Sequence, residues 1–263
     1  MKKLASCLLA AVLLMIAAEA IAYAQAKPQW WFVREQVVAP EKVFDYYEGV
    51  MEEWTQAAKY GVPFTNVAAW SSNDFHFYFS IRIEGLDSVD DLQAAWAKFR
   101  ADLKTKMGEA AFSAMMKKLE GTVEYDHYYV FVGRPDLSYY PQTPRLKPEE
   151  GNFLSWQYWY IKDDMVGELE AVAKEMVALF KDKNYLEPVE VSEGLLGDDV
   201  PVFFAAFRGK DMADQYAHDV SLVLGHDKAY NALVERLYKA ARKLVRVNLN
   251  YVPELSYYPK AEK

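Results

Sequence analysis

The chain has 263 residues, of which 52% are hydrophobic and 26% charged, so its composition is globular and excludes an intrinsically disordered protein. Aspartate and glutamate number 38 against 30 lysines and arginines, and the formal net charge of −8 argues against a general binder of nucleic acid or anionic membranes. The one cysteine excludes a disulfide framework and a cysteine-ligated zinc site.

The N-terminal segment has the pattern of a secretory signal peptide. Lys2 and Lys3 give a positive start, Leu4 to Ala18 is almost wholly apolar, and A-x-A sequences end at Ala24 and Ala26. The apolar run is short for a transmembrane span, although an uncleaved anchor is the alternative. We therefore predict cleavage, a periplasmic or secreted location, and no stable membrane insertion of the mature chain.

A seven-residue motif indicates that the mature chain is a tandem repeat. PDLSYYP at 135–141 recurs as PELSYYP at 253–259, with six of seven positions identical. Weaker matches keep the same order, such as WFVRE at 31–35 with WYIKD at 159–163. The period is longer than that of solenoid repeats, so each unit is the size of a domain. The predicted organisation is a signal peptide over 1–26, a first repeat over 27–141, a linker over 142–151 and a second repeat over 152–263.

The first repeat has the order strand, helix, strand, strand, helix, strand. Its clearest strand alternates strictly, with Phe77, Phe79 and Ile81 on one face and His76 and Tyr78 on the other. The expected elements are strands at 30–38, 64–70, 75–83 and 122–133, a helix with an apolar stripe over 43–54, and a helix from 87 or 88 to about 119 that breaks at Gly108.

The second repeat has the same order. Its last strand places Val245, Val247 and Leu249 on one face and polar side chains on the other. The expected elements are strands at 153–162, 189–191, 202–207 and 244–252, a helix over 169–180, and a helical region over 212–243 that breaks near Gly225.

This element order predicts the fold class. The βαββαβ order, found twice, is the ferredoxin-like pattern. Helices cover one face of each sheet, and the other faces are too aromatic to lie in water, so we expect the two sheets to pack face to face. The predicted fold is α+β, with two tandem ferredoxin-like repeats forming an eight-stranded, two-sheet barrel. The PDLSYYP motifs follow the last strand of each repeat, which favours a structural role over a ligand contact.

Over residues 27–259 the chain resembles the dimeric α+β barrel superfamily, in its fused form with both halves in one polypeptide. The resemblance rests on the order and length of the elements. The superfamily includes antibiotic-biosynthesis-type monooxygenases, EthD-like proteins and haem enzymes of the chlorite dismutase type, and the chain carries the signature of none of these families. Because fusion already supplies both halves of the barrel, we expect a monomer.

The space between the two sheets is the expected small-molecule pocket, because apolar walls with a few fixed polar groups are the usual form of such a site. The alternative is that these side chains only satisfy one another, and a one-residue shift in strand phase would exchange the two faces. Alternation assigns to the pocket the candidate ligand-binding residues His76, Tyr78, Arg82, Tyr128, Phe204, Arg246, Asn248 and Asn250, with Ser80, Asp126, Val202 and Ala206 beside them.

The sequence gives little support for a metal site, a cofactor site or a catalytic nucleophile. The four histidines lack any H-x-x-x-H or H-E-x-x-H spacing, so no metal site is predicted. No cofactor is predicted either, although the resemblance leaves open a haem with His76 or His127 as its single axial ligand. The mature chain would lack cysteine, and G-x-S-x-G and nucleotide-binding glycine motifs are missing, so no catalytic residue is assigned.

Three functions remain as hypotheses. The leading one is binding of a small apolar or aromatic ligand between the sheets, with Arg82, Arg246, Asn248 and Asn250 orienting a polar or anionic group. The second is an enzyme, which the resemblance suggests as a haem-dependent oxidoreductase or a cofactor-free oxygenase with Tyr78, His76 or Asn248 in proton transfer. The third is a protein-interaction module with an exposed apolar patch.

Overall fold

The computed structural model describes residues 28–197 and 199–259, so the predicted signal peptide lies outside the described residues. Short 3₁₀ helices occur at Pro40–Lys42, Pro148–Glu150, Asp163–Met165 and Pro253–Leu255. The longer elements are β1 (Trp30–Val38), α2 (Val43–Tyr60), β2 (Ala68–Ser71), β3 (His76–Ile83), α3 (Ser88–Met107), α4 (Glu109–Leu119), β4 (Val123–Gly133), β5 (Phe153–Ile161), α5 (Val166–Asp182), β6 (Glu190–Leu196), β7 (Val202–Gly209), α6 (Met212–Ala217), α7 (Val220–Val223), α8 (Lys228–Ala240) and β8 (Ala241–Tyr251).

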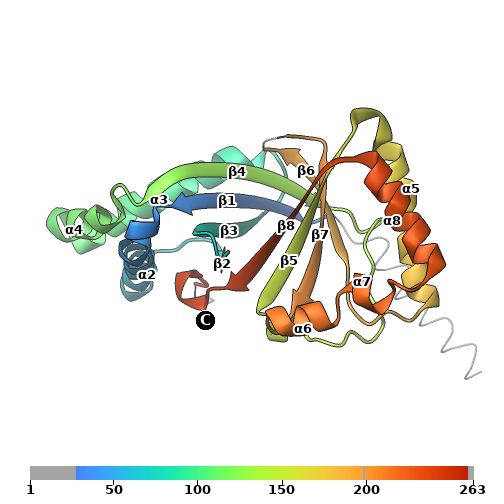
Figure 1. The fold of residues 1–263 in the computed structure, drawn as a ribbon. Coiled ribbons are helices and arrows are strands. Elements are labelled where there is room, and N and C mark those ends of the chain that lie inside the picture. Colours follow the sequence, from blue (N-terminus) through green and yellow to red (C-terminus); the bar gives the residue numbers. More distant parts are fainter. Residues whose placement is uncertain (1–27, 198, 260–263) are drawn as a thin grey trace, which may run out of the picture.

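The strands form one closed barrel made of two four-stranded halves. The order around the barrel is β1-β3-β2-β8-β5-β7-β6-β4, so each half has its last strand beside its first, as in a ferredoxin-like sheet. The halves join through the antiparallel pairs β2–β8 and β4–β6. Helices α2, α3 and α4 lie on one side and α5 and α8 on the other (Figure 1). The predicted α+β barrel of two tandem repeats is therefore confirmed.

Local sequence explains where the helices end. Helix α2 ends at Gly61, whose φ of 59° is left-handed and suits glycine. The expected break at Gly108, which has a φ of 83°, separates α3 from α4. The region 212–243 departs from its prediction: it divides into α6, α7 and α8, and its last residues already belong to β8. Within the described residues, no helix combines the length and apolar character that a membrane span requires.

The inner faces of the sheets form a packed aromatic core. Tyr78 of the first half meets Trp156 of the second with ring centroids 5.6 Å apart, and Phe131 meets Phe204 at 4.7 Å. These rings belong to a cluster of buried side chains from both sheets. Burial of this apolar area is the main force that holds the halves together.

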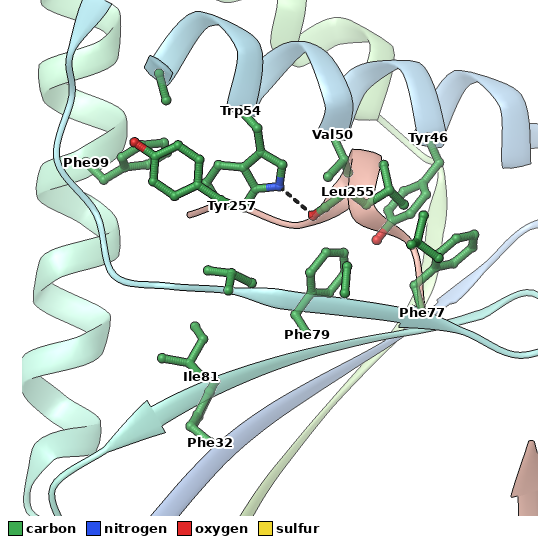
Figure 2. Packing of buried hydrophobic residues seen from close by; sticks show 14 of the residues in the cluster. Phe32, Tyr46, Val50, Trp54, Phe77, Phe79, Ile81, Phe99, Leu255 and Tyr257 are labelled. Carbon is green, nitrogen blue, oxygen red and sulfur yellow. Dashed lines mark hydrogen bonds between the residues drawn. The ribbon is translucent and has the colours of Figure 1, made fainter. Parts of the chain in front are cut away.

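The outer face of the first sheet packs against its helices in a second aromatic core (Figure 2). Phe77, Phe79 and Ile81, predicted to share one face of β3, all point into it. Trp54 of α2 stacks on Tyr257 with ring centroids 4.8 Å apart. The phase predicted for β3 is therefore correct.

The C-terminal PELSYYP motif belongs to the core of the opposite half. Leu255 is fully buried in the first half's core, where its backbone carbonyl accepts a hydrogen bond of 2.8 Å from Trp54 Nε1 (Figure 2). The amide of Tyr257 donates to the Val67 carbonyl at 2.9 Å, and its hydroxyl donates to the Val62 carbonyl at 2.9 Å.

The PDLSYYP motif at the end of the first half packs into the second half in the same way. The amide of Tyr139 donates to the Val189 carbonyl at 2.9 Å, and its hydroxyl donates to the Tyr185 carbonyl at 2.7 Å. Ser138 Oγ accepts from the Val191 amide at 2.9 Å. The two motifs thus form a reciprocal clasp, in which each half completes the core of the other. The predicted structural role is correct, but each motif packs on the partner half and not on its own.

The register also corrects one internal match. Strand β1 begins at Trp30 and β5 at Phe153, and both occupy the same place between their neighbours. Trp31 therefore corresponds to Leu154 and not to Trp159, because the match between 31–35 and 159–163 is displaced along the strand. The two PDLSYYP-type motifs, in contrast, follow β4 and β8 at equivalent positions.

Candidate functional site

A cavity of about 240 Å³ lies on the helix side of the second sheet. It is enclosed by α5, α7, α8 and the outer faces of β5, β6, β7 and β8, and we call it the helix-side cavity. Most of its wall is aliphatic or aromatic, with α5 alone contributing Leu169, Val172, Ala173, Met176, Val177 and Phe180. Tyr139 of the clasp also lines it, so the first half contributes to the wall.

One end of the helix-side cavity is polar. Asp219, which is 3% exposed, caps the N-terminus of α7 by accepting from the Ser221 amide at 2.9 Å and hydroxyl at 2.6 Å. Arg246 of β8 donates to the same carboxylate at 3.0 Å, and Gln157 lies opposite Arg246 on the neighbouring strand. Burial opposes ionisation of Asp219, but the Ser221 bonds and Arg246 hold the pKa of this carboxyl below its ordinary value.

Beside this polar end lie buried oxygen atoms without a hydrogen bond. In the part of the chain that the structure describes, Ser155 Oγ, Gln215 Oε1 and Asn248 Oδ1 have no partner. Ser155 is 0% and Gln215 2% exposed, and Ser155 lies directly opposite Asn248 in the β5–β8 pair. Such atoms cost roughly 1–3 kcal/mol each, so a native protein seldom keeps several together without a use for them.

The first half is apolar at the corresponding positions. Strand for strand, Ser155 corresponds to Phe32 and Asn248 to Val130, and both of these side chains are buried in the first half's core. The packed first half and the hollow, polar second half therefore differ at equivalent positions of one repeated fold.

A second polar cluster lies on the barrel side of the first sheet, and we call it the Glu35 cluster. Glu35 of β1 is 8% exposed. Its Oε1 lies 2.5 Å from His76 Nδ1 and accepts from the Tyr78 hydroxyl at 2.8 Å, while its Oε2 accepts from the Tyr129 hydroxyl at 2.7 Å. Burial, followed by the charge of Glu35, raises the pKa of Tyr78 far above its ordinary value, so this phenol stays protonated.

Four predicted pocket residues face the barrel, and four do not. His76, Tyr78 and Arg82 lie on the barrel side of β3, and Phe204 lies there on β7. The expectation that Tyr128, Arg246, Asn248 and Asn250 face the barrel is wrong, because β4 and β8 have the opposite phase. Leu249, Val247 and Phe131 fill the barrel instead.

The polar residues of β8 face outward because α6 and α7 supply their partners. Arg246 meets Asp219, and Asn248 donates to the Tyr216 hydroxyl at 3.1 Å. On β4, Asp126, which was also assigned to the pocket, instead forms a two-bond ion pair with Arg34 on the outer face, at 2.7 and 2.9 Å.

Sequence reasoning missed Glu35, Gln157, Asp219 and Ser221. Glu35 carried a usable signal, since it is the one carboxylate on the strand Trp30–Val38 and shares its face with Trp31 and Val33. For Asp219 and Ser221 the sequence carries no signal, because the pattern of their segment predicts part of one long helical region.

The helix-side cavity does not fit a haem. No histidine or cysteine lines it, and both candidate axial ligands, His76 and His127, lie on the barrel side of the other half. Its volume is also below the range of about 300–1,000 Å³ that larger ligands use. Among the described residues, no group of three or more histidine, cysteine, aspartate or glutamate side chains could hold a metal ion.

Comparison with known proteins supports the fold. No family model and no curated protein matches the chain. An anthrone oxidase-like protein of known structure is similar with a TM-score of 0.55 at 12% identity, over 87% of this chain and 93% of that one. A chlorite dismutase from Candidatus Nitrospira defluvii is similar with a TM-score of 0.47 at 11% identity, over 90% and 96%. The likeness to the anthrone oxidase-like protein shows a shared fold and identifies no family for this chain.

Proposed function

We propose that this protein binds a small, largely apolar or aromatic molecule with one polar or anionic group in the helix-side cavity. The observation that carries the proposal is the cavity of about 240 Å³ with an apolar wall and one polar end. We therefore place the ligand site beneath α5 and α8, and not between the two sheets, where aromatic side chains fill the space.

The polar end offers complementary groups to such a ligand. The Arg246 guanidinium has five N–H donors, and its recorded bond to Asp219 comes from Nη2 alone, so it can also bind a carboxylate or a phenolic oxygen. Gln157 on the neighbouring strand can donate or accept. The small volume limits the ligand to about one or two rings, for which the aromatic wall supplies contact area.

The experiment is titration calorimetry with benzoate and phenol as probes, together with native mass spectrometry of the purified protein. Ala173 faces the cavity, so Ala173→Phe should fill it and abolish binding. Ala178 is exposed on the same helix, so Ala178→Phe is the matched control and should bind as the wild type does. Arg246→Gln should weaken benzoate more than phenol, because only benzoate carries a full negative charge.

Two results would overturn this proposal. The first is equal binding by Ala173→Phe and the wild type, which would place the ligand elsewhere. The second is a protein that binds neither probe and carries no co-purified molecule.

We also propose that the mature chain acts after export to the periplasm or outside the cell, as a monomer. The sequence pattern of residues 1–26 supports export, and the closed barrel within one chain supports a monomer. N-terminal sequencing of protein from a periplasmic fraction should start after Ala24 or Ala26, and light scattering should give the mass of one mature chain. A start at Met1 would overturn the export proposal.

A further inference from the structure

We propose that His76 and Glu35 form a general-base pair, at the end of the barrel where β1 stops and β3 begins, that removes a proton from a small aromatic substrate. This site lies on the opposite face of the barrel wall from the helix-side cavity and in the other half of the chain. It is therefore independent of the ligand-binding proposal.

The hydrogen bond to Glu35 determines which nitrogen of His76 is the base. A carboxylate accepts, so the contact of 2.5 Å between Nδ1 and Oε1 places the proton of a neutral imidazole on Nδ1. The lone pair is then on Nε2. A carboxylate behind Nδ1 also stabilises the imidazolium that forms when Nε2 takes up a proton, as in hydrolase triads.

Two tyrosines keep Glu35 in that role. Tyr78 and Tyr129 donate to Oε1 and Oε2, so the carboxylate receives three hydrogen bonds while it is almost completely buried. These bonds fix the carboxylate behind Nδ1 of His76. Since burial raises the pKa of Tyr78 far above its ordinary value, Tyr78 acts as a donor here and not as a competing base.

A substrate can reach the imidazole from solvent. The His76 side chain keeps 28% of its surface exposed, whereas the side chain of Glu35, taken without its backbone, keeps 11%. Val37 lies between His76 and Tyr125 in the pairing of β3, β1 and β4, so the three side chains share one face at this end of the barrel. Tyr125 is 62% exposed, and an exposed aromatic ring on the same face as the base favours an aromatic substrate.

The proposed step is a proton transfer. The Nε2 lone pair takes a proton from a weakly acidic C–H or O–H, the electrons of that bond delocalise into the substrate, and Glu35 balances the charge on the imidazolium. The imidazolium then returns the proton to another atom of the substrate or to water, so no oxidant or reductant is needed.

Several titratable groups face His76. Glu35 lies on β1, and Tyr78 is its neighbour on β3, with stacked rings 6.4 Å apart. Asp74 in the β2–β3 turn places Oδ2 3.9 Å from Nε2, and His127 on β4 lies opposite Glu35.

The test uses 5-nitrobenzisoxazole, a probe that needs only a base. Removal of its ring C–H proton forms a nitrile and breaks the N–O bond, which releases the coloured 2-cyano-4-nitrophenolate. The full mature chain should accelerate this reaction above buffer. His76→Gln should lower the protein-dependent rate by about 100-fold or more, the range for loss of a positioned base. His226→Gln, which changes an exposed histidine in the second half, is the control and should retain the wild-type rate.

Two further variants separate catalysis from structure. His76→Ala should regain activity when imidazole is added, which a purely structural role would not produce. Glu35→Gln should lower the protein-dependent rate while His76 remains in place, because the carboxylate no longer accepts the Nδ1 proton and no longer balances the charge of the imidazolium. The proposal is overturned if the wild type does not exceed buffer, if His226→Gln loses as much rate as His76→Gln, or if imidazole fails to rescue a folded His76→Ala.

Discussion

The reciprocal clasp makes a quantitative prediction at Leu255. This side chain is 0% exposed in the core of the first half, although it comes from the end of the second half. Leu255→Ala removes three carbon atoms, worth about 2.4 kcal/mol at ~0.8 kcal/mol each, and the remaining cavity brings the usual total to about 2–5 kcal/mol. For about 3 kcal/mol, a chain of this size should lose roughly 6–12 °C in Tm.

The assay is thermal unfolding by calorimetry, with urea unfolding as a second measure. Leu222→Ala is the matched control, because the same atoms are removed from a side chain that is 65% exposed, and it should change stability by less than about 0.5 kcal/mol. If both variants shift Tm equally, then Leu255 does not stabilise the first half's core and the clasp has no energetic role.

Three other perturbations have definite expected results. Trp54→Phe leaves the Leu255 carbonyl without its 2.8 Å donor and should cost about 1–3 kcal/mol in urea unfolding. The lowered pKa of Asp219 means that it stabilises the fold above the unfolded pKa of about 3.9 and that this contribution is lost as pH falls through the folded pKa. Asp219→Asn should therefore flatten the dependence of Tm on pH below about pH 4. Gly209→Ala would place a Cβ 2.6 Å from Gln215 Cβ and 2.8 Å from Asp211 O and Gln215 N, so it should displace α6 and destabilise by about 1–3 kcal/mol. Because Gln215 of α6 donates to Asp219 at 3.4 Å, benzoate binding in calorimetry should weaken as well.

The sequence predicted the fold because its signals were local and repeated. Strict alternation in β3 gave the correct face for Phe77, Phe79 and Ile81, and Gly108 gave the correct division between two helices. The repeated motif indicated that two equivalent units exist. These inferences need only the period of side chains along one element, which does not depend on distant partners.

The site was predicted less well because the phase of a strand depends on what covers it. On β8 both faces are plausible from sequence, since Val247 and Leu249 alternate with Arg246 and Asn248. Which face of β8 turns toward the helices depends on Asp219, which is 27 residues before Arg246 in the sequence and is its partner in the fold. The rule that polar residues line a pocket between sheets therefore failed where the pocket lay on the other side of the sheet.

The two halves place their buried polar groups on opposite faces of the barrel wall. Glu35 corresponds in the second half to Tyr158 and His76 to Val202, so the barrel side is polar in the first half and apolar in the second. The helix side shows the reverse, with Phe32 and Val130 in the first half against Ser155 and Asn248 in the second.

At each of these positions, a polar side chain in a packed interior lowers the stability of the fold. The other half has apolar residues at the equivalent positions, so the backbone of this fold accommodates apolar side chains there. The fold therefore does not require the polar groups. If the helix-side cavity binds a ligand and the Glu35 cluster acts as a base, as we propose, each use offsets this cost. Because the two sites lie on opposite faces of the barrel wall, variants in one should leave the measured activity of the other unchanged.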